Sequence, residues 1–314
     1  MLIRRISKVA LLAGAGLIVL LGISLLYVGS KIKKEFEQKI HENLATLATE
    51  GYELVYEPFK CRGFLSYECS SKSFKILKAS DASLLLSMKN LRIGLKDIET
   101  YSMQEYVKAD IDKINYDMPD DFKPIAIKLF ITDQVRDKRE GVVRNDGWFE
   151  IETKSALFTL KLDMYRKDPA FTNKNMIKIA LQMPINSFLD NTLLNIQNLS
   201  FKVKSNHIYQ SLLKANNMQE EEYQKHIDLE SASIQMLVGL YAEVLNLPDR
   251  QEIFKALEAY KELLKGQKDS VEVGLKIREQ GEYYFNSSYL KNIEGLKMIL
   301  SQIFASYNIY VIAQ

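Results

Sequence analysis

The sequence predicts an α+β protein: an N-terminal transmembrane helix, then a large, mostly antiparallel β-sheet domain with an inserted helical hairpin. Three observations predict this fold. An uncharged apolar run fills residues 9–28, period-two alternation dominates about the next 150 residues after residue 50, and helical periodicity returns over residues 206–265. With 314 residues, 47% hydrophobic and 26% charged, the chain can bury a core and does not have the composition of a disordered protein. The predicted parts are a tail (1–8), an anchor (9–28), a stalk helix (31–50) and a folded domain (51–314).

The apolar run at residues 9–28 reads VALLAGAGLIVLLGISLLYV and contains no charge. Twenty helical residues at about 1.5 Å each span the roughly 30 Å hydrocarbon layer of a bilayer. A cleaved signal peptide is the alternative, but its apolar core is only about 7–15 residues long and ends at a small-x-small site. Residues 28–30 match such a site poorly, so we expect an uncleaved anchor.

The expected orientation of the anchor depends on the lengths of the two segments that it connects, a short tail and a long domain. Arg4, Arg5 and Lys8 precede the segment, and three lysines follow it within residues 31–34, so the flanking charges are nearly balanced. Long downstream domains translocate largely regardless of charge, whereas a short cationic tail resists export. We therefore expect the tail in the cytoplasm and residues 31–314 on the far side of the membrane.

Cys61 and Cys69 are the only cysteines of the chain. An isolated pair eight positions apart suits an oxidising compartment, so we expect a disulfide across a hairpin centred near Leu65, with Gly63 supplying backbone freedom. In the chain-entropy model, closing this short loop stabilises the fold by about 2–3 kcal/mol. Two unpaired thiols are the alternative.

The stalk is predicted because Ile32, Phe36, Ile40, Leu44 and Leu47 recur at helical spacing. A single amphipathic helix needs a partner for its apolar stripe, and we expect this partner to be the chain's own folded domain. Gly51 is a suitable helix stop.

Period-two alternation after the stalk predicts antiparallel strands. Clear examples are residues 52–56, 125–131, 159–164 and 177–183, which are separated by turn-rich segments. One apolar and one mostly polar face is typical of a sheet that covers something on one side only. We expect one large meandering sheet.

The helical hairpin is predicted at residues 206–265, where Pro248 interrupts the helical periodicity and Asp249 is a suitable cap for a second helix. Beyond it, the sequence predicts a strand over 271–277, a helix over 288–305 and a closing strand over 308–313.

The segment around the cysteines, YEPFKCRGFLS at residues 56–66, combines a strand with an Arg-Gly-aromatic-x-Ser turn. Together with an N-terminal anchor and a short helix, it resembles the start of the YdgA-like family of bacterial envelope proteins, at Arg62, Gly63, Phe64 and Ser66. The two flanking cysteines depart from the family pattern. The resemblance implies a single-pass anchor in the bacterial inner membrane and a periplasmic β-rich domain, and it supplies no catalytic residues.

The sequence contains no recognisable catalytic or cofactor motif. His41, His207 and His226 lie far apart without metal-ligand spacing, and neither Gly-x-Ser-x-Gly nor a phosphate-binding loop occurs. The acidic cluster at 110–121 lacks the spacing of a calcium loop and indicates a solvated turn. Trp148 is expected to be a core residue at a strand start, with a binding-site aromatic as the alternative. We expect no enzymatic activity, no cofactor and no metal.

Charge excludes nucleic acid as a partner, because the chain beyond residue 30 carries 39 basic and 40 acidic side chains. Two non-enzymatic functions are expected instead: an apolar face that binds a lipid, or an assembly or scaffolding factor for a membrane protein complex. The expected partners are the membrane, through residues 9–28, and either a lipid or another envelope protein. A hydrolase is the third hypothesis, which no nucleophile and base spacing supports, and clustering of Asp112, Asp117 and His207 in one polar cleft would revive it.

Overall fold

The computed structural model describes residues 51–63, 66–174, 192–244, 250–278, 283–291 and 305–314, together with residues 38, 44, 45, 176, 294, 295, 298 and 299. The predicted tail, the predicted anchor and the predicted strand at 177–183 lie outside the described residues. Within the described part of the chain, none of the helices has the length and apolar character needed to cross a membrane.

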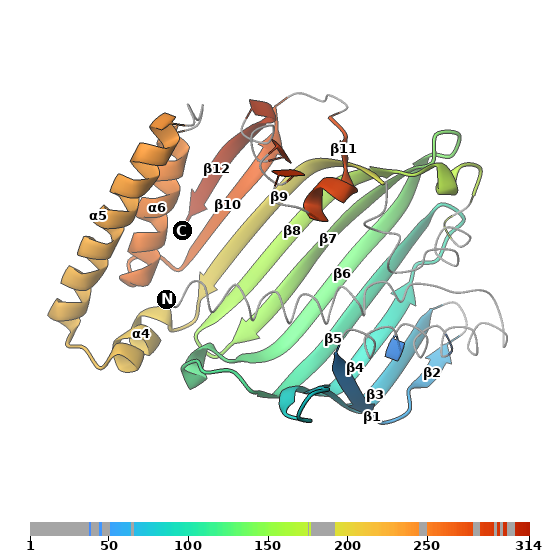
Figure 1. The fold of residues 1–314 in the computed structure, drawn as a ribbon, viewed down its shortest axis with the longest axis horizontal. Coiled ribbons are helices and arrows are strands. Elements are labelled where there is room, and N and C mark those ends of the chain that lie inside the picture. The colour runs from blue at the N-terminus through green and yellow to red at the C-terminus, as the bar shows by residue number, and fades with distance from the viewer. Residues whose placement is uncertain are drawn as a thin grey trace.

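The described residues form one twelve-stranded sheet in which every pairing is antiparallel (Figure 1). Strands β3 to β9 follow one another in chain order, which confirms the predicted meander. β1 and β2 both pair with β3, β10 and β12 extend the other end, and β11 pairs with β9. The strands are β1 (Tyr52–Tyr56), β2 (Lys60–Gly63), β3 (Tyr67–Lys78), β4 (Leu84–Lys96), β5 (Ser102–Ile114), β6 (Pro124–Asp137), β7 (Val142–Thr153), β8 (Ala156–Lys167), β9 (Leu193–Ser205), β10 (Ser270–Ile277), β11 (Phe285–Asn286) and β12 (Tyr307–Ala313).

The helical insert between β9 and β10 contains three helices: α4 (Ile208–Asn216), α5 (Glu220–Val244) and α6 (Arg250–Leu264). The predicted two-helix hairpin is therefore wrong in its helix count. The reason is Asn217, which takes a left-handed conformation with φ +52° and donates its N–H to the carbonyls of Leu213 and Lys214. Asparagine tolerates this conformation, so α4 ends where the apolar spacing alone would continue.

Shorter elements complete the fold. Among the described residues, 3₁₀ helices occur at η1 (Asp120–Phe122), η2 (Pro169–Phe171) and η4 (Ser287–Lys291). The helix predicted at 288–305 is described in part, and its described start is the 3₁₀ helix η4. In the predicted stalk, residues 38, 44 and 45 are helical, and Leu44 is buried against the sheet as expected.

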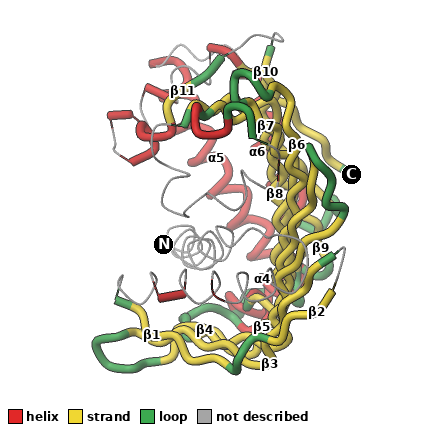
Figure 2. Tube along the Cα trace, turned by 90° about the vertical axis from the view of Figure 1, so that its right-hand side faces the viewer, coloured by secondary structure: helices red, strands yellow, loops and turns green. Residues whose placement is uncertain are grey.

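The sheet bends into an arc, and β11 and η4 lie on its inner side (Figure 2). The apolar side chains of the strands gather into separate cores on one face of the sheet. The largest core covers β1 to β6 and includes Leu44, and a second one covers β8 to β12 through α4 and α6. Two smaller cores form around Phe171 and around Phe285. One face of the sheet is thus apolar, as the alternation predicts, but the elements that cover it are spread unevenly.

Candidate functional site

Two rows of residues on the apolar face of β7 to β12 are less buried than the cores around them. Each row runs across the strands through directly opposed positions. The first row is Phe149, Leu160, Phe201, Val273 and Val311, and the second is Gly147, Leu162, Leu199, Leu275 and Ile309. We call these ten residues the open strip. None of them is buried, and the opposed pair Leu160 and Phe201 is 40% and 41% exposed.

Covered cores border the open strip on three sides. Toward β6, the first row continues into Leu129, which is 6% exposed. At one end of the strands, α4 and α6 bury Val203 and Val271. At the other end, Phe285 and Ile299 pack against Met164. The strip is therefore a less buried part of the apolar face. It is most open at Leu160 and Phe201, whereas four other members, Phe149, Leu162, Val273 and Val311, pack against the neighbouring cores.

The dimensions of the open strip follow from sheet geometry. Four inter-strand spacings of about 4.8 Å separate β7 from β12, so the strip is about 19 Å long. Two same-face residues on one strand lie about 7 Å apart, so the strip is narrow. The Phe158 ring stacks on the Phe201 ring with 6.3 Å between centroids, at the edge of the strip. Leu160 and Phe201 are the exposed members of the strip, and its other eight residues are half-buried.

A buried polar cluster interrupts the apolar face at the far ends of β5 to β8. It consists of Glu105, Asp133, Asn145 and Arg166, of which the last three are 6%, 7% and 4% exposed. The Asn145 amide donates a hydrogen bond to an Asp133 carboxylate oxygen directly across β6 and β7. The Arg166 guanidinium lies 4.8 Å from the centroid of the Phe171 ring.

The charged members of this cluster shift one another's pKa values. Burial raises the pKa of Asp133, and the charge of Arg166 and hydrogen bonds from Asn145 and Glu105 oppose that rise. Burial likewise lowers the pKa of Arg166, while Asp133 and Glu105 favour its charged form. Taking one partner away would leave a buried charge uncompensated. Because three of its members are buried and Arg166 lies against the buried Phe171 ring, we assign the cluster a structural role at the border of the open strip.

The predicted disulfide is confirmed, since Cys61 and Cys69 are bonded to each other. They occupy directly opposed positions of β2 and β3, and both are buried in the largest core. Cys69 also opposes Ile93 on β4. The cysteine pair therefore lies at the covered end of the row of opposed residues that leads into the first row of the open strip. The disulfide therefore pins the covered end of the sheet.

The described residues of the Arg-Gly-aromatic-x-Ser turn shape the hairpin between β2 and β3. Gly63 has φ +122°, which side chains rarely tolerate, and a Cβ atom there would collide with the carbonyl oxygen of Ser66. The exposed Arg62 places Nη2 2.8 Å from Oε1 of Glu68 across the hairpin. Phe64 lies outside the described residues.

The acidic residues at 110–121 are distributed among separate partners. Asp110 accepts a hydrogen bond from Asn90, Asp112 pairs with Lys89, Asp120 lies 2.6 Å from Lys123, and Asp121 lies 3.4 Å from Lys214. Among the described residues, no group of three or more His, Cys, Asp or Glu side chains has the arrangement of a metal site.

Ser155 and His207 take part in a backbone brace at the junction with Asp121. Ser155 is fully buried, and its hydroxyl donates to the backbone carbonyl of Asp121 at 2.9 Å. His207 joins the same junction only through its backbone N–H, which donates to the Ser155 carbonyl at 2.9 Å. The imidazole of His226 instead lies 3.3 Å from Glu230 on α5. These contacts fix chain segments and present no activated nucleophile.

Trp148 does not lie where the sequence suggests. It occupies the interior of β7, half-buried on the polar face, and stacks on Phe130 with 5.9 Å between ring centroids. Lys96 lies over the same Phe130 ring at 5.5 Å. The expectation of a core residue at a strand start is wrong because β7 begins at Val142, and its alternation places Phe149, not Trp148, on the apolar face.

Comparisons of the chain with protein-family models, with curated proteins and with solved structures find no match. The similarity of the cysteine hairpin to the YdgA-like family therefore stays a prediction, and function has to be argued from the chain's own surfaces.

Proposed function

We propose that this chain is a non-enzymatic, membrane-anchored envelope protein whose exported domain binds the acyl chain of a lipid along the open strip. The observation that carries this proposal is the opposed pair Leu160 and Phe201, which stays about two-fifths exposed at the centre of the half-buried strip. The predicted anchor at 9–28 would hold the domain at a membrane surface, where lipid is abundant.

The shape of the open strip favours a hydrocarbon chain over a compact ligand. A surface about 19 Å long and about 7 Å wide matches one extended chain lying across the strands. Each methylene removed from water contributes about 0.8 kcal/mol, so a chain lying along most of the strip gains enough to be drawn onto it. No charged side chain belongs to the strip, so the recognised group is apolar.

The test uses the full chain in vesicles that contain a phospholipid with a photoactivatable diazirine in its acyl chain. After irradiation, mass spectrometry locates the adducts on peptides of the chain. We expect adducts on the β8 and β9 peptides that carry Leu160 and Phe201, in addition to any on the predicted anchor. Adducts confined to residues 9–28 would refute lipid binding by the domain.

Variants separate specific binding from chance labelling. Leu160→Lys places a charge in the middle of the strip and should abolish the labelling of β9. Ile312→Lys places the same charge on an exposed apolar residue of β12, 48% exposed and out of phase with the strip, and should leave that labelling unchanged. Equal labelling in both variants would contradict the proposal.

The second candidate, an assembly or scaffolding factor, is favoured by a different surface. Helix α5 carries the four most exposed large apolar side chains of the described residues, at Leu229, Met236, Leu237 and Leu240. This surface lies outside the open strip, so a protein partner and a lipid would not compete for the same residues.

A further inference from the structure

One side of α5 is an uncovered apolar stripe. Leu229, Met236, Leu237 and Leu240 are 70%, 65%, 53% and 56% exposed, and the exposed small residues Ala232 and Ser233 lie between them. At about 100° per residue, these six positions fall within about 140° of one another around the helix axis. We call them the α5 stripe. A monomeric protein rarely exposes apolar side chains in such a continuous line.

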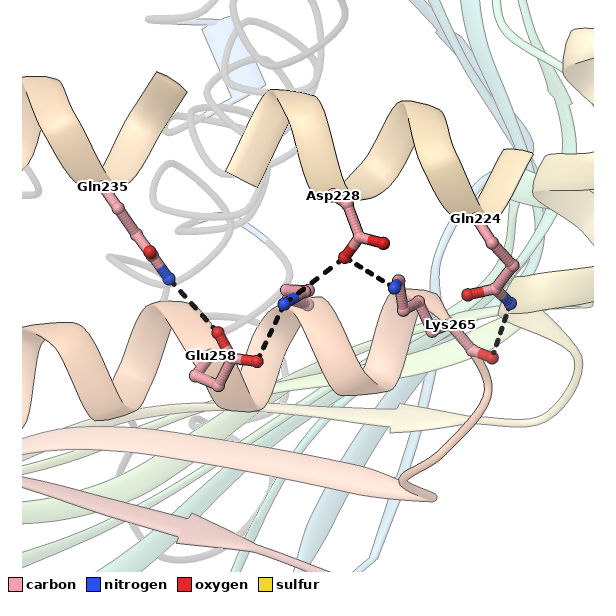
Figure 3. Close-up of polar contacts among 6 residues, drawn as sticks. Gln224, Asp228, Gln235, Glu258 and Lys265 are labelled. Carbon is pink, nitrogen blue, oxygen red and sulfur yellow. Dashed lines mark hydrogen bonds and ion pairs between the residues drawn. The ribbon is translucent and has the colours of Figure 1, made fainter. Parts of the chain in front are cut away.

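Contacts with α6 fix which side of α5 faces outward (Figure 3). Asp228 accepts from Lys265 at 2.6 Å and lies 3.4 Å from Lys261, while Gln235 donates to Glu258 at 3.2 Å. The side chain of Gln224 donates to the carbonyl of Lys265. The hydrogen bond from Lys265 lowers the pKa of Asp228, so this pairing holds at neutral pH. The rotation of α5 is thereby set, and the stripe points away from α6.

The α5 stripe is symmetric about the point between Ile234 and Gln235. If a second α5 runs antiparallel about a two-fold axis at that point, Leu229 opposes Leu240 of the second copy. Likewise, Ala232 opposes Leu237 and Ser233 opposes Met236, so that a small residue meets a large one in these two inner pairs. Matching of small with large residues is what close helix packing requires, and a two-fold axis demands a self-complementary surface.

The charge of α5 disfavours an anionic bilayer and a parallel helix pair at this surface. The helix contains six acidic residues and one lysine, whereas helices that lie on anionic bilayers carry Lys and Arg on their polar side. Glu220, Glu221 and Glu222 form its first turn. A parallel pair would bring both acidic turns together, whereas an antiparallel pair places them at opposite ends and aligns the helix dipoles favourably.

We propose that two copies of this chain associate through the α5 stripe, with the two α5 helices antiparallel and centred between Ile234 and Gln235. α5 lies farthest from the sheet in the insert, with α6 between it and β12, so it is open to a second copy (Figure 1). One helix pair buries less than the roughly 1,200 Å² of a stable interface, so the dimer is reversible. This inference does not depend on lipid binding by the open strip.

Cysteine cross-linking of the full chain tests both contact and direction. Because the two native cysteines are bonded to each other, Leu229→Cys or Leu240→Cys adds the only free thiol. In the antiparallel pair the two copies of position 229 are about 17 Å apart along the axis, too far for a disulfide. We expect a mixture of the two variants to form cross-linked heterodimers and each variant alone to form none. Cross-linking of each variant alone would indicate a parallel pair, and its absence in the mixture would overturn the contact.

The strength of association gives an independent readout, measured as the concentration dependence of the mass of the full chain in detergent. Met236→Lys should weaken self-association at least tenfold, whereas Met236→Leu should preserve it and Ile312→Lys should leave it unchanged. No self-association of the unaltered chain, or equal association of Met236→Lys, would refute the proposal.

Discussion

A single row of side chains crosses the sheet from one edge to the other, and its two halves differ sharply in cover. In the half formed by β2 to β6 the row consists of Cys61, Cys69, Ile93, Val107 and Leu129, none more than 7% exposed. In the half formed by β7 to β12 it consists of the first row of the open strip. The strands, the register and the residue types continue without a break, so only the covering elements change.

The two halves therefore differ in how much apolar area they bury, although they share the same sequence pattern. Burial of apolar area stabilises the covered half by about 25 cal/mol for each square ångström removed from water. At the exposed Leu160 and Phe201 of the open strip, less apolar area is removed from water on folding. A ligand that covered these side chains would gain the remaining stabilisation. This difference in burial at the same sequence pattern supports the proposed binding surface.

The largest effect is expected at the polar cluster that borders the two halves. Arg166→Met should destabilise the fold by about 3–5 kcal/mol at about pH 7, because it leaves buried Asp133 without its counter-charge. Burial places the folded pKa of Asp133 above its unfolded value, so stability from this group is present at low pH and lost as pH rises. We therefore expect a smaller loss at about pH 5. Chemical unfolding at both pH values measures this.

Arg166→Lys is the matched control because it keeps the positive charge, and we expect it to lose less stability at about pH 7. A loss for Arg166→Met that does not shrink toward low pH would show that Asp133 is not the group left uncompensated.

Truncating one aromatic residue in each half compares the halves directly. Phe74 is 1% exposed in the covered half, and Phe74→Ala should cost about 3–5 kcal/mol through lost burial and the cavity left behind. Phe201 is 41% exposed, so Phe201→Ala should cost less than about half as much. Urea unfolding of both variants gives the two values, and equal costs would mean that the strip is covered in solution.

The disulfide lies in the covered half of the sheet. Replacing Cys61 and Cys69 together by Ala should lower the free energy of unfolding by about 2–3 kcal/mol, because the unfolded chain regains the freedom of a short loop. The unaltered chain unfolded in reductant should match the double variant. If reductant does not change the unfolding of the unaltered chain, the bond does not contribute to stability.

The smallest effect is expected in the centre of the open strip. Leu160→Lys should change the free energy of unfolding by no more than about 0.5 kcal/mol, since the side chain is already partly in water and the lysine can extend into solvent. Thermal unfolding in the absence of lipid checks this. A large loss would place Leu160 in a core instead of a binding surface.

Sequence pattern predicted the sheet because alternation records which side of each strand faces the core. It also predicted the disulfide, since two cysteines in one hairpin have one partner each. Alternation does not record whether an apolar face is covered, because Leu129 and Leu160 carry the same pattern at 6% and 40% exposure. That difference depends on what packs against each part of the sheet: Leu129 belongs to the core that includes Leu44, whereas α4, α6 and β11 belong to other cores. These packings are set by contacts far apart in the chain.

Two further features escaped prediction for local reasons. The helix count was wrong because a left-handed asparagine, Asn217, ends α4 without any glycine or proline. The buried cluster was missed because single polar residues in strands resemble turn or surface positions. A usable signal existed, since Asp133 is in phase with Ile127, Leu129 and Ile131 and therefore points to the apolar side.

The most direct test of lipid binding at the open strip compares two indoles in the full chain, placed in vesicles of phospholipid brominated in its acyl chains. Trp148, the only tryptophan, lies on the polar face and serves as the internal control. The second indole comes from Phe201→Trp in a protein that also carries Trp148→Phe. The account predicts strong bromine quenching of the indole at position 201 and little quenching of Trp148. Equal and weak quenching of both would contradict it.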